Sequence, residues 1–204
     1  TISAQSGDAK SQYQLGRLYD QGDGIEEDNE KAVDWYRKSA EQGYAKAQGY
    51  LSEMYFMGEG VQQDDDEAVY WSRKAAKQND ALGQNNVGFM YDEGRGVSED
   101  NPEALKWFLK SAKQGYAMGQ ASVGQMYLAG EVGIEKSYEQ ALYWARKAAE
   151  QGDVLGQVTL GIIYDNGLGV TQDDSIAVGW YKKAAGQGDA AGQNLLGRMY
   201  FYGE

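Results

Sequence analysis

The sequence contains no cysteine and no histidine among its 204 residues, and it has a single proline. Without cysteine there is no disulfide framework, no thiol nucleophile and no thiolate metal site. Without histidine, Ser-His-Asp triads and the usual zinc ligand sets are excluded as well. Carboxylates, lysine, tyrosine and serine are the residue types left for catalysis. We predict a protein that is not an enzyme and that holds no metal and no cofactor.

Basic residues are also scarce. The chain has 19 Lys and Arg against 31 Asp and Glu, a net charge of −12 and an isoelectric point near 4.5. Nucleic acids and anionic membrane surfaces attract clustered basic residues, so neither is expected as a partner. No apolar run approaches the roughly 20 residues of a membrane-spanning helix, so no membrane insertion is expected. Thr1 stands where an initiator methionine would be, which indicates a removed leader or a cut from a longer protein.

The most informative feature of the sequence is a repeat. Successive copies open at Gly7, Gly43, Asn79, Gly115, Gly152 and Gly188, so by subtraction the spacings are 36, 36, 36, 37 and 36. A period of about 20–50 residues is typical of a solenoid, whose units bury their apolar faces only against their neighbours. We predict repeats at residues 7–42, 43–78, 79–114, 115–151 and 152–187, a partial repeat at 188–204, and the tail of a preceding repeat at 1–6.

Each copy has the pattern of two helices joined by a glycine-rich turn. In the first copy they are expected near residues 8–21 and 30–42, because apolar residues recur there at helical spacing. The second helices carry all five tryptophans at one position, which predicts a core role: Trp35, Trp71, Trp107, Trp144 and Trp180. A glutamine and a tyrosine recur in all six first helices, and we expect the glutamine to bind a neighbouring backbone.

Glycines mark the inside and the end of each first helix. An interior glycine, such as Gly16, predicts a close approach of the second helix, and the glycine after the helix predicts a left-handed cap. The following G-x-G could suggest a phosphate loop, but no strand precedes it and its neighbours are acidic. The acidic residues after it lack the calcium-loop pattern and are expected to cap the second helices. Repeat four has an extra turn residue and Ser137-Tyr138 in place of the acidic pair, which predicts a local distortion.

The run L-G-x-x-Y-x-x-G-x-G-[VI]-x-x-D, followed by [KE]-A-[VL]-x-W-[YF]-x-K-[SA]-A-x-Q-G, resembles the Sel1-like repeat family, relatives of the tetratricopeptide repeat. The resemblance covers essentially the whole chain. It implies an all-α fold, an α/α superhelix of about five and a half 36-residue helix-turn-helix repeats that serves as a scaffold for protein partners. It also favours a bacterial, extracytoplasmic setting. A cysteine-rich subset is linked to β-lactam binding, but this chain has no cysteine to carry that feature over.

First-helix positions that vary between copies are expected to face solvent. By analogy with the tetratricopeptide superhelix they would line a concave groove that binds a partner, although packing between neighbouring first helices would also explain them. The thirteenth position after the opening residue alternates between Asp and an apolar residue from copy to copy, and packing that alternates between turns is one explanation. The predicted partner-binding residues are Lys10, Arg17, Lys46, Tyr50, Glu53, Leu82, Asn85, Phe89, Met118, Gln125, Leu155, Val158, Ile162 and Arg198.

Three functions are consistent with these observations. The favoured one is a non-catalytic adaptor that binds a peptide segment of another protein in the concave groove. The alternative is a binder of cell-wall or β-lactam ligands or a hydrolase, using carboxylate pairs such as Asp92 and Glu93. The third is end-to-end self-association through the incomplete terminal repeats. For that function, the last repeat is expected to expose Leu196, Met199, Tyr200 and Phe201.

Overall fold

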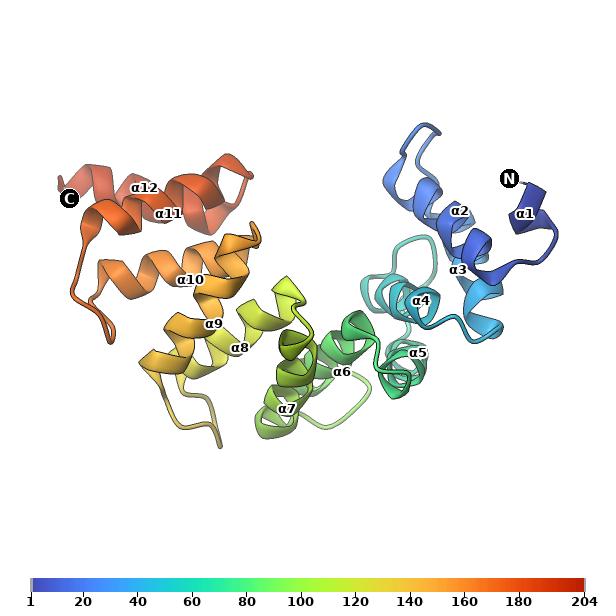
Figure 1. Ribbon diagram of the computed structural model, residues 1–204, viewed down its shortest axis with the longest axis horizontal. Coiled ribbons are helices and arrows are strands. Elements are labelled where there is room, and N and C mark those ends of the chain that lie inside the picture. The colour runs from blue at the N-terminus through green and yellow to red at the C-terminus, as the bar shows by residue number, and fades with distance from the viewer. Residues whose placement is uncertain (1, 204) are drawn as a thin grey trace. The chain divides into compact units, whose positions relative to one another are not determined.

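The computed structural model describes residues 2–203, which form twelve helices and no strand (Figure 1). The fold is therefore all-α with a repeated helix-turn-helix arrangement, as predicted. The chain divides into two compact units, Thr1–Trp107 and Phe108–Glu204, and the boundary falls within α7. The helices are α1 (Ile2–Gln5), α2 (Ala9–Gln21), α3 (Asn29–Glu41), α4 (Ala45–Met57), α5 (Asp65–Lys77), α6 (Ala81–Glu93), α7 (Asn101–Lys113), α8 (Ala117–Ala129), α9 (Tyr138–Glu150), α10 (Val154–Asp165), α11 (Asp174–Gly186) and α12 (Ala190–Tyr202).

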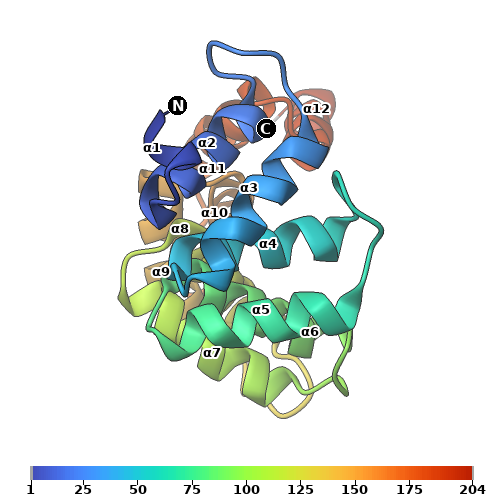
Figure 2. The same cartoon turned by 90° about the vertical axis from the view of Figure 1, so that its right-hand side faces the viewer.

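Within each unit, a first helix packs against the second helix of its own repeat and the second helix of the repeat before it. In the first unit α4 contacts both α3 and α5, and in the second unit α10 contacts both α9 and α11. First helices also contact one another directly, α4 with α6 and α8 with α10. Figure 2 shows α3, α4, α5 and α6 following one another in chain order. Each helix is therefore held by its neighbours along the chain, as in a solenoid.

The helices begin and end where the sequence predicts. Asp28, Asp64 and Asp173 cap second helices, and each carboxylate accepts a hydrogen bond from a backbone N–H in the first turn. Such a cap satisfies a donor that has no partner within the helix. After the first helices, glycines such as Gly22 and Gly58 adopt the left-handed conformation, with φ of 64° and 75°. A Cβ-bearing residue would be strained at both glycines.

Interior glycines allow the two helices of a repeat to approach closely, which confirms the prediction. A Cβ at Gly16 would lie 2.7 Å from Cδ1 of Tyr36, and one at Gly161 would lie 2.4 Å from Cε1 of Tyr181. At Gly124 the nearest atom would be the backbone nitrogen of Ala145, at 3.0 Å. The space of a missing side chain is thus taken by a ring in some repeats and by backbone in another.

The shared glutamines join consecutive repeats. The amide of Gln48 on α4 donates to the carbonyl of Ala40 at the end of α3, at 3.0 Å, and accepts from the amide of Gln78 after α5, at 2.7 Å. Gln120 makes the same pair of bonds in the second unit, with Ala112 at 3.2 Å and Gln151 at 2.8 Å. The prediction of a backbone partner is confirmed for Gln48 and Gln120, and the second glutamine is an addition from the structure.

Packing alternates between two kinds of repeat, which accounts for the two-repeat pattern in the sequence. In the first and fifth repeats a buried tyrosine of the second helix donates to the carboxylate at the thirteenth position of the first helix. Tyr36 reaches Asp20 at 2.9 Å, and Tyr181 reaches Asp165 at 3.2 Å. In the second and fourth repeats the tyrosine is replaced by a small residue and the acid by an apolar one. There the tryptophan is buried instead, as for Trp71.

The distortion expected in the fourth repeat stays within its turn. The N–H of Ser137 donates to the carbonyl of Tyr127 at 3.0 Å, as the N–H of Asp28 does to Tyr19 at 2.9 Å in the first repeat. The Ser137 hydroxyl also caps α9, which has 13 residues like α3 and α5. The extra residue therefore lengthens the loop without changing how the two helices are joined.

The final helix is only partly uncovered. Tyr200 and Phe201 are exposed, as predicted, and Leu196 is partly buried. The expectation is wrong for Met199, which is fully buried in a cluster with Ala177 and Tyr181. The reason is that Met199 faces the preceding second helix, α11, and that neighbour is present.

Candidate partner-binding face

The first-helix face is defined here as the third, sixth, seventh, tenth and thirteenth positions after the opening residue of each repeat, which lie on α2, α4, α6, α8, α10 and α12. The predicted binding residues differ in how far they are buried, and they form three groups. Exposed residues are Lys10, Lys46, Met118, Gln125 and Arg198. Partly buried residues are Arg17, Tyr50, Glu53, Phe89, Leu155 and Ile162. Buried residues are Leu82, Asn85 and Val158.

The expectation of solvent exposure is wrong for Leu82, Asn85 and Val158, because neighbouring first helices pack on one another. A Cβ at Gly49 on α4 would lie 3.1 Å from Cδ2 of Leu82 on α6. Next to this contact, the amide of Asn86 donates to the carbonyl of Gly49 at 3.0 Å. The sixth position after the opening residue, which holds Asn85 and Val158, therefore belongs to the interior.

Four tyrosines from three helices cluster at the start of the first-helix face. The ring of Tyr13 on α2 lies 5.3 Å from the ring of Tyr44 and 5.7 Å from that of Tyr50, centroid to centroid. Tyr36 of α3 stacks on Tyr50 at 5.4 Å. Burial raises the pKa of Tyr13 to about 12, so its phenol stays protonated at neutral pH. Such rings offer broad apolar contact together with hydroxyl groups.

The side chain of Glu53 lies among other carboxylates. Burial, followed by the negative charges of Asp20, Glu59 and Asp80, raises the pKa of Glu53 to about 7. Its neighbour Asp20 is the acceptor of the Tyr36 hydroxyl, so the acidic group adjoins the tyrosine cluster. No group of three acidic side chains among residues 2–203 is arranged to hold a metal ion. The protonated form of Glu53 is therefore favoured up to a pH near 7.

Arg95 links Phe56 to Asp65, a role that the sequence did not predict. Its guanidinium lies over the ring of Phe56, 3.7 Å from the centroid, and donates to the Phe56 carbonyl at 2.8 Å. It also donates to the Asp65 carboxylate and lowers the pKa of that group. The signal in the sequence is charge, since Asp23 and Glu59 occupy the same place in the G-x-G turns of the first two repeats.

Ile162 and Asp92, both named from the sequence, are partly buried in the structure. Ile162 packs against the cluster formed by Ala177, Tyr181 and Met199, so its replacement would also affect stability. Asp92, named for the hydrolase alternative, is half-buried, and its pKa is raised by burial and by the adjacent Glu93. The Glu93 carboxylate in turn lies 3.9 Å from the guanidinium of Arg95.

In residues 2–203, no helix is both long and apolar enough to cross a membrane.

Comparison with known proteins defines the class of protein. The Sel1 repeat family matches residues 9–44, 45–80, 81–116, 117–153, 155–189 and 190–204. The helical pairs and the match together show that the chain belongs to the Sel1 repeat family. None of the functionally curated proteins compared matches this chain.

Solved structures give three similar proteins. A protective antigen of uropathogenic Escherichia coli strains is 45% identical over 99% of this chain, with a TM-score of 0.78. This chain spans only 43% of that antigen. A Sel1 repeat protein from Oxalobacter formigenes is 36% identical over 97% of this chain and 78% of its own length, with a TM-score of 0.83. An immunity protein from Pseudomonas aeruginosa is 25% identical over 90% of this chain and 67% of its own length, with a TM-score of 0.63.

Proposed function

We propose that the chain is a non-catalytic scaffold that binds a peptide segment of a partner protein along the first-helix face. The observation that best supports this is the tenth position, where no side chain is fully buried and the residue type changes along the array. The side chains shared by the copies are, in contrast, used for packing and for links between repeats. From the first repeat to the sixth, the tenth position holds Arg17, Glu53, Phe89, Gln125, Ile162 and Arg198.

The tyrosine cluster supports the same face as the place of contact. Partly exposed aromatic rings such as Tyr44 and Tyr50 are typical anchors of protein interfaces, where a few residues carry most of the binding energy. Sel1 repeat arrays commonly mediate protein–protein interaction, and one similar structure is an immunity protein. A binder of cell-wall ligands, a hydrolase and end-to-end self-association stay untested predictions.

The first test compares exposed residues on the two kinds of helix. The chain captures a partner from a bacterial lysate, mass spectrometry identifies the partner, and affinities are then measured with purified proteins. Lys46→Glu, Met118→Glu and Gln125→Arg alter the first-helix face, while Asp34→Lys and Glu139→Lys serve as controls on second helices. All five side chains are exposed, so the thermal midpoint should be unchanged.

The proposal predicts that at least one first-helix substitution weakens binding about tenfold, or about 1.4 kcal/mol, as expected for one of the minority of interface residues that contribute more than about 1 kcal/mol. The second-helix controls should change affinity less than about twofold, as expected outside an interface. Weakening by the controls alone would place the partner on the second helices and overturn the proposal.

A further inference from the structure

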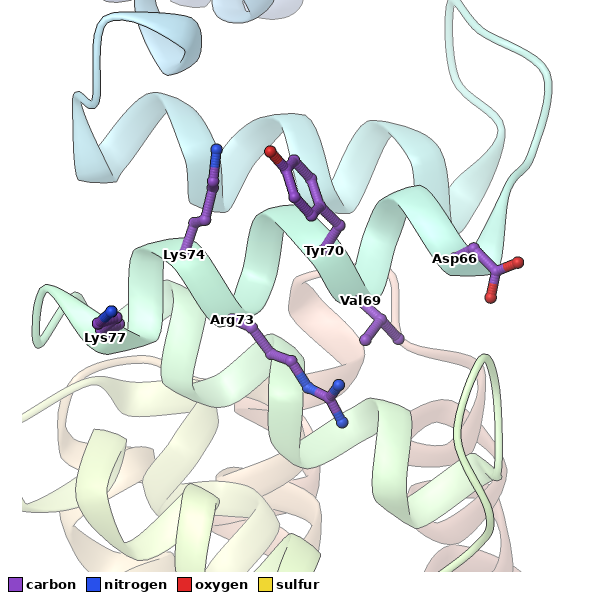
Figure 3. Close-up of a pocket in the computed structure, with 6 residues that line it drawn as sticks. All are labelled: Asp66, Val69, Tyr70, Arg73, Lys74 and Lys77. Carbon is purple, nitrogen blue, oxygen red and sulfur yellow. The ribbon is translucent and has the colours of Figure 1, made fainter.

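The second helix α5 carries a shallow groove of about 410 Å³ on its outer side (Figure 3). In Figure 3, the side chains of Tyr70 and Lys74 extend to one side of α5, and those of Val69 and Arg73 extend to the other. All of its lining residues come from this one helix, over three turns. They are Asp66, Val69, Tyr70, Arg73, Lys74 and Lys77.

The groove is basic in an otherwise acidic protein. In the described part of the chain, Arg73, Lys74 and Lys77 form no ion pair, although acidic residues outnumber basic ones 31 to 19. The ammonium of Lys74 lies over two rings instead, 4.4 Å from the centroid of Tyr70 and 5.0 Å from that of Trp71. Arg73 donates to the hydroxyl of Tyr91 at 3.3 Å, a neutral partner. Against these three cations the lining holds one carboxylate, Asp66, so the groove keeps a net positive charge.

We propose that this groove binds a short acidic segment of a protein partner, with its carboxylates against Arg73, Lys74 and Lys77 and an apolar side chain against Tyr70. Arg73 and Lys77 are separated by one helical turn, about 6 Å along the axis. Carboxylates on alternate residues of an extended segment are about 7 Å apart, so two of them match that separation. A nucleic acid or an anionic bilayer is disfavoured, because the net charge of −12 repels an extended polyanion.

The fourth repeat provides a natural comparison. On α9 the same aromatic pair is present, with the Tyr143 and Trp144 rings 4.9 Å apart and Lys147 4.7 Å from the centroid of Tyr143. Glu150, however, occupies the place of Lys77 in α5. The charge at the end of the helix is the feature that we expect to separate a binding groove from a non-binding one. This proposal concerns the second helices and does not depend on the first-helix face.

The test uses the full chain labelled with 15N and a defined probe. The probe is an acetylated hexapeptide, Ser-Glu-Phe-Glu-Ser-Glu, and its control has glutamine in place of each glutamate. The proposal predicts saturable amide shift changes on α5 with the acidic peptide at low salt and none with the control peptide. Lys77→Glu should weaken binding about fivefold, since it replaces an attraction by a repulsion. Lys77 is exposed, so this variant should fold.

The reciprocal substitution on α9 tests the proposal by creating a second binding groove. Glu150→Lys should give α9 the charge pattern of α5 and create a second set of shift changes there. Equal binding of both peptides, an unchanged affinity after Lys77→Glu, or no shifts on α5 at millimolar peptide would each overturn the proposal. Tighter binding of a single-stranded oligonucleotide with the same number of charges at α5 would overturn it in favour of a nucleic acid.

Discussion

At the scale of single residues, side chains shared by all copies make recurring contacts, whereas residues found in one copy have individual chemistry. Gln48 and Gln120 each join three consecutive helices through the same two kinds of hydrogen bond. Glu53 has no counterpart of its type at the tenth position, and its burial among carboxylates favours the protonated form. Individual chemistry of this kind is where a binding function distinct to this protein would lie.

We predict that Glu53→Gln stabilises the protein increasingly as pH rises. The carboxyl has a pKa near 7 in the folded chain and an ordinary value of 4.5, so the folded state is favoured when Glu53 is protonated. Wild-type stability is thus fully present below about pH 4.5 and falls between there and about pH 7. The difference from the variant should reach about 3 kcal/mol above that range.

Urea unfolding of both proteins at several pH values measures this difference. Glu150→Gln is the control, because it is the same change of side chain at an exposed position. If the free energy of unfolding differed between Glu53→Gln and wild type by the same amount from pH 4 to pH 8, the raised pKa of Glu53 would be contradicted.

At the scale of helices, glycine position determines how closely a pair can pack. Gly161 of α10 faces the ring of Tyr181, while Gly197 of α12 has no atom within 4 Å of where a Cβ would lie. The two glycines occupy the same place in their repeats, but among residues 2–203 only the helix of Gly161 has a second helix after it. They therefore form a matched pair for separating packing from helix propensity.

We predict opposite effects for Gly161→Ala and Gly197→Ala. At Gly161 the new methyl would lie 2.4 Å from Cε1 of Tyr181, so the ring must move, and we expect a loss of about 1–3 kcal/mol. At Gly197 the methyl meets open space, and the better helix propensity of alanine should add about 0.5–1 kcal/mol. Circular dichroism melts of the two variants check both signs. Equal destabilisation by the two substitutions would show that the close contact with Tyr181 does not determine the effect at Gly161.

At the scale of the whole molecule, stability comes from many contacts between neighbouring repeats, and a strong negative charge opposes it. Each compact unit is held by first and second helices in succession, so the free energy is approximately a sum of repeat and interface contributions. A net charge of −12 adds repulsion that no single contact removes. Conditions that weaken this repulsion should act on the chain as a whole.

We predict that added salt raises the thermal midpoint at neutral pH. Raising sodium chloride from about 10 mM to about 200 mM shortens the screening length from about 30 Å to below 10 Å, which weakens repulsion between distant carboxylates. Differential scanning fluorimetry measures the midpoint across this range. A triple variant, Glu26→Gln, Glu27→Gln and Asp66→Asn, should respond less, since these exposed acids contribute to the repulsion. A midpoint that falls with salt would show that attractive ion pairs dominate.

Much of the architecture could be predicted from sequence because it follows from local patterns. The period, the pairing of helices and the caps at Asp28 and Asp64 depend on residues that are close in the chain. The exposed residues of the binding face could be predicted only in part. Periodicity within one helix identifies its most apolar stripe, but it does not show how wide a surface the neighbouring first helix covers, as at Asn85 and Val158.

The sequence alone therefore determined the repeat, the all-helical fold and the caps at glycine and aspartate, because helix periodicity and capping are set by residues that are close in the chain. Only the tertiary structure decided that Leu82 is buried, that Met199 is covered and that Arg95 joins Phe56 to Asp65. Those outcomes depend on the distance and rotation between packed helices. Such quantities arise from side chains far apart in the chain, and no spacing within one repeat contains them.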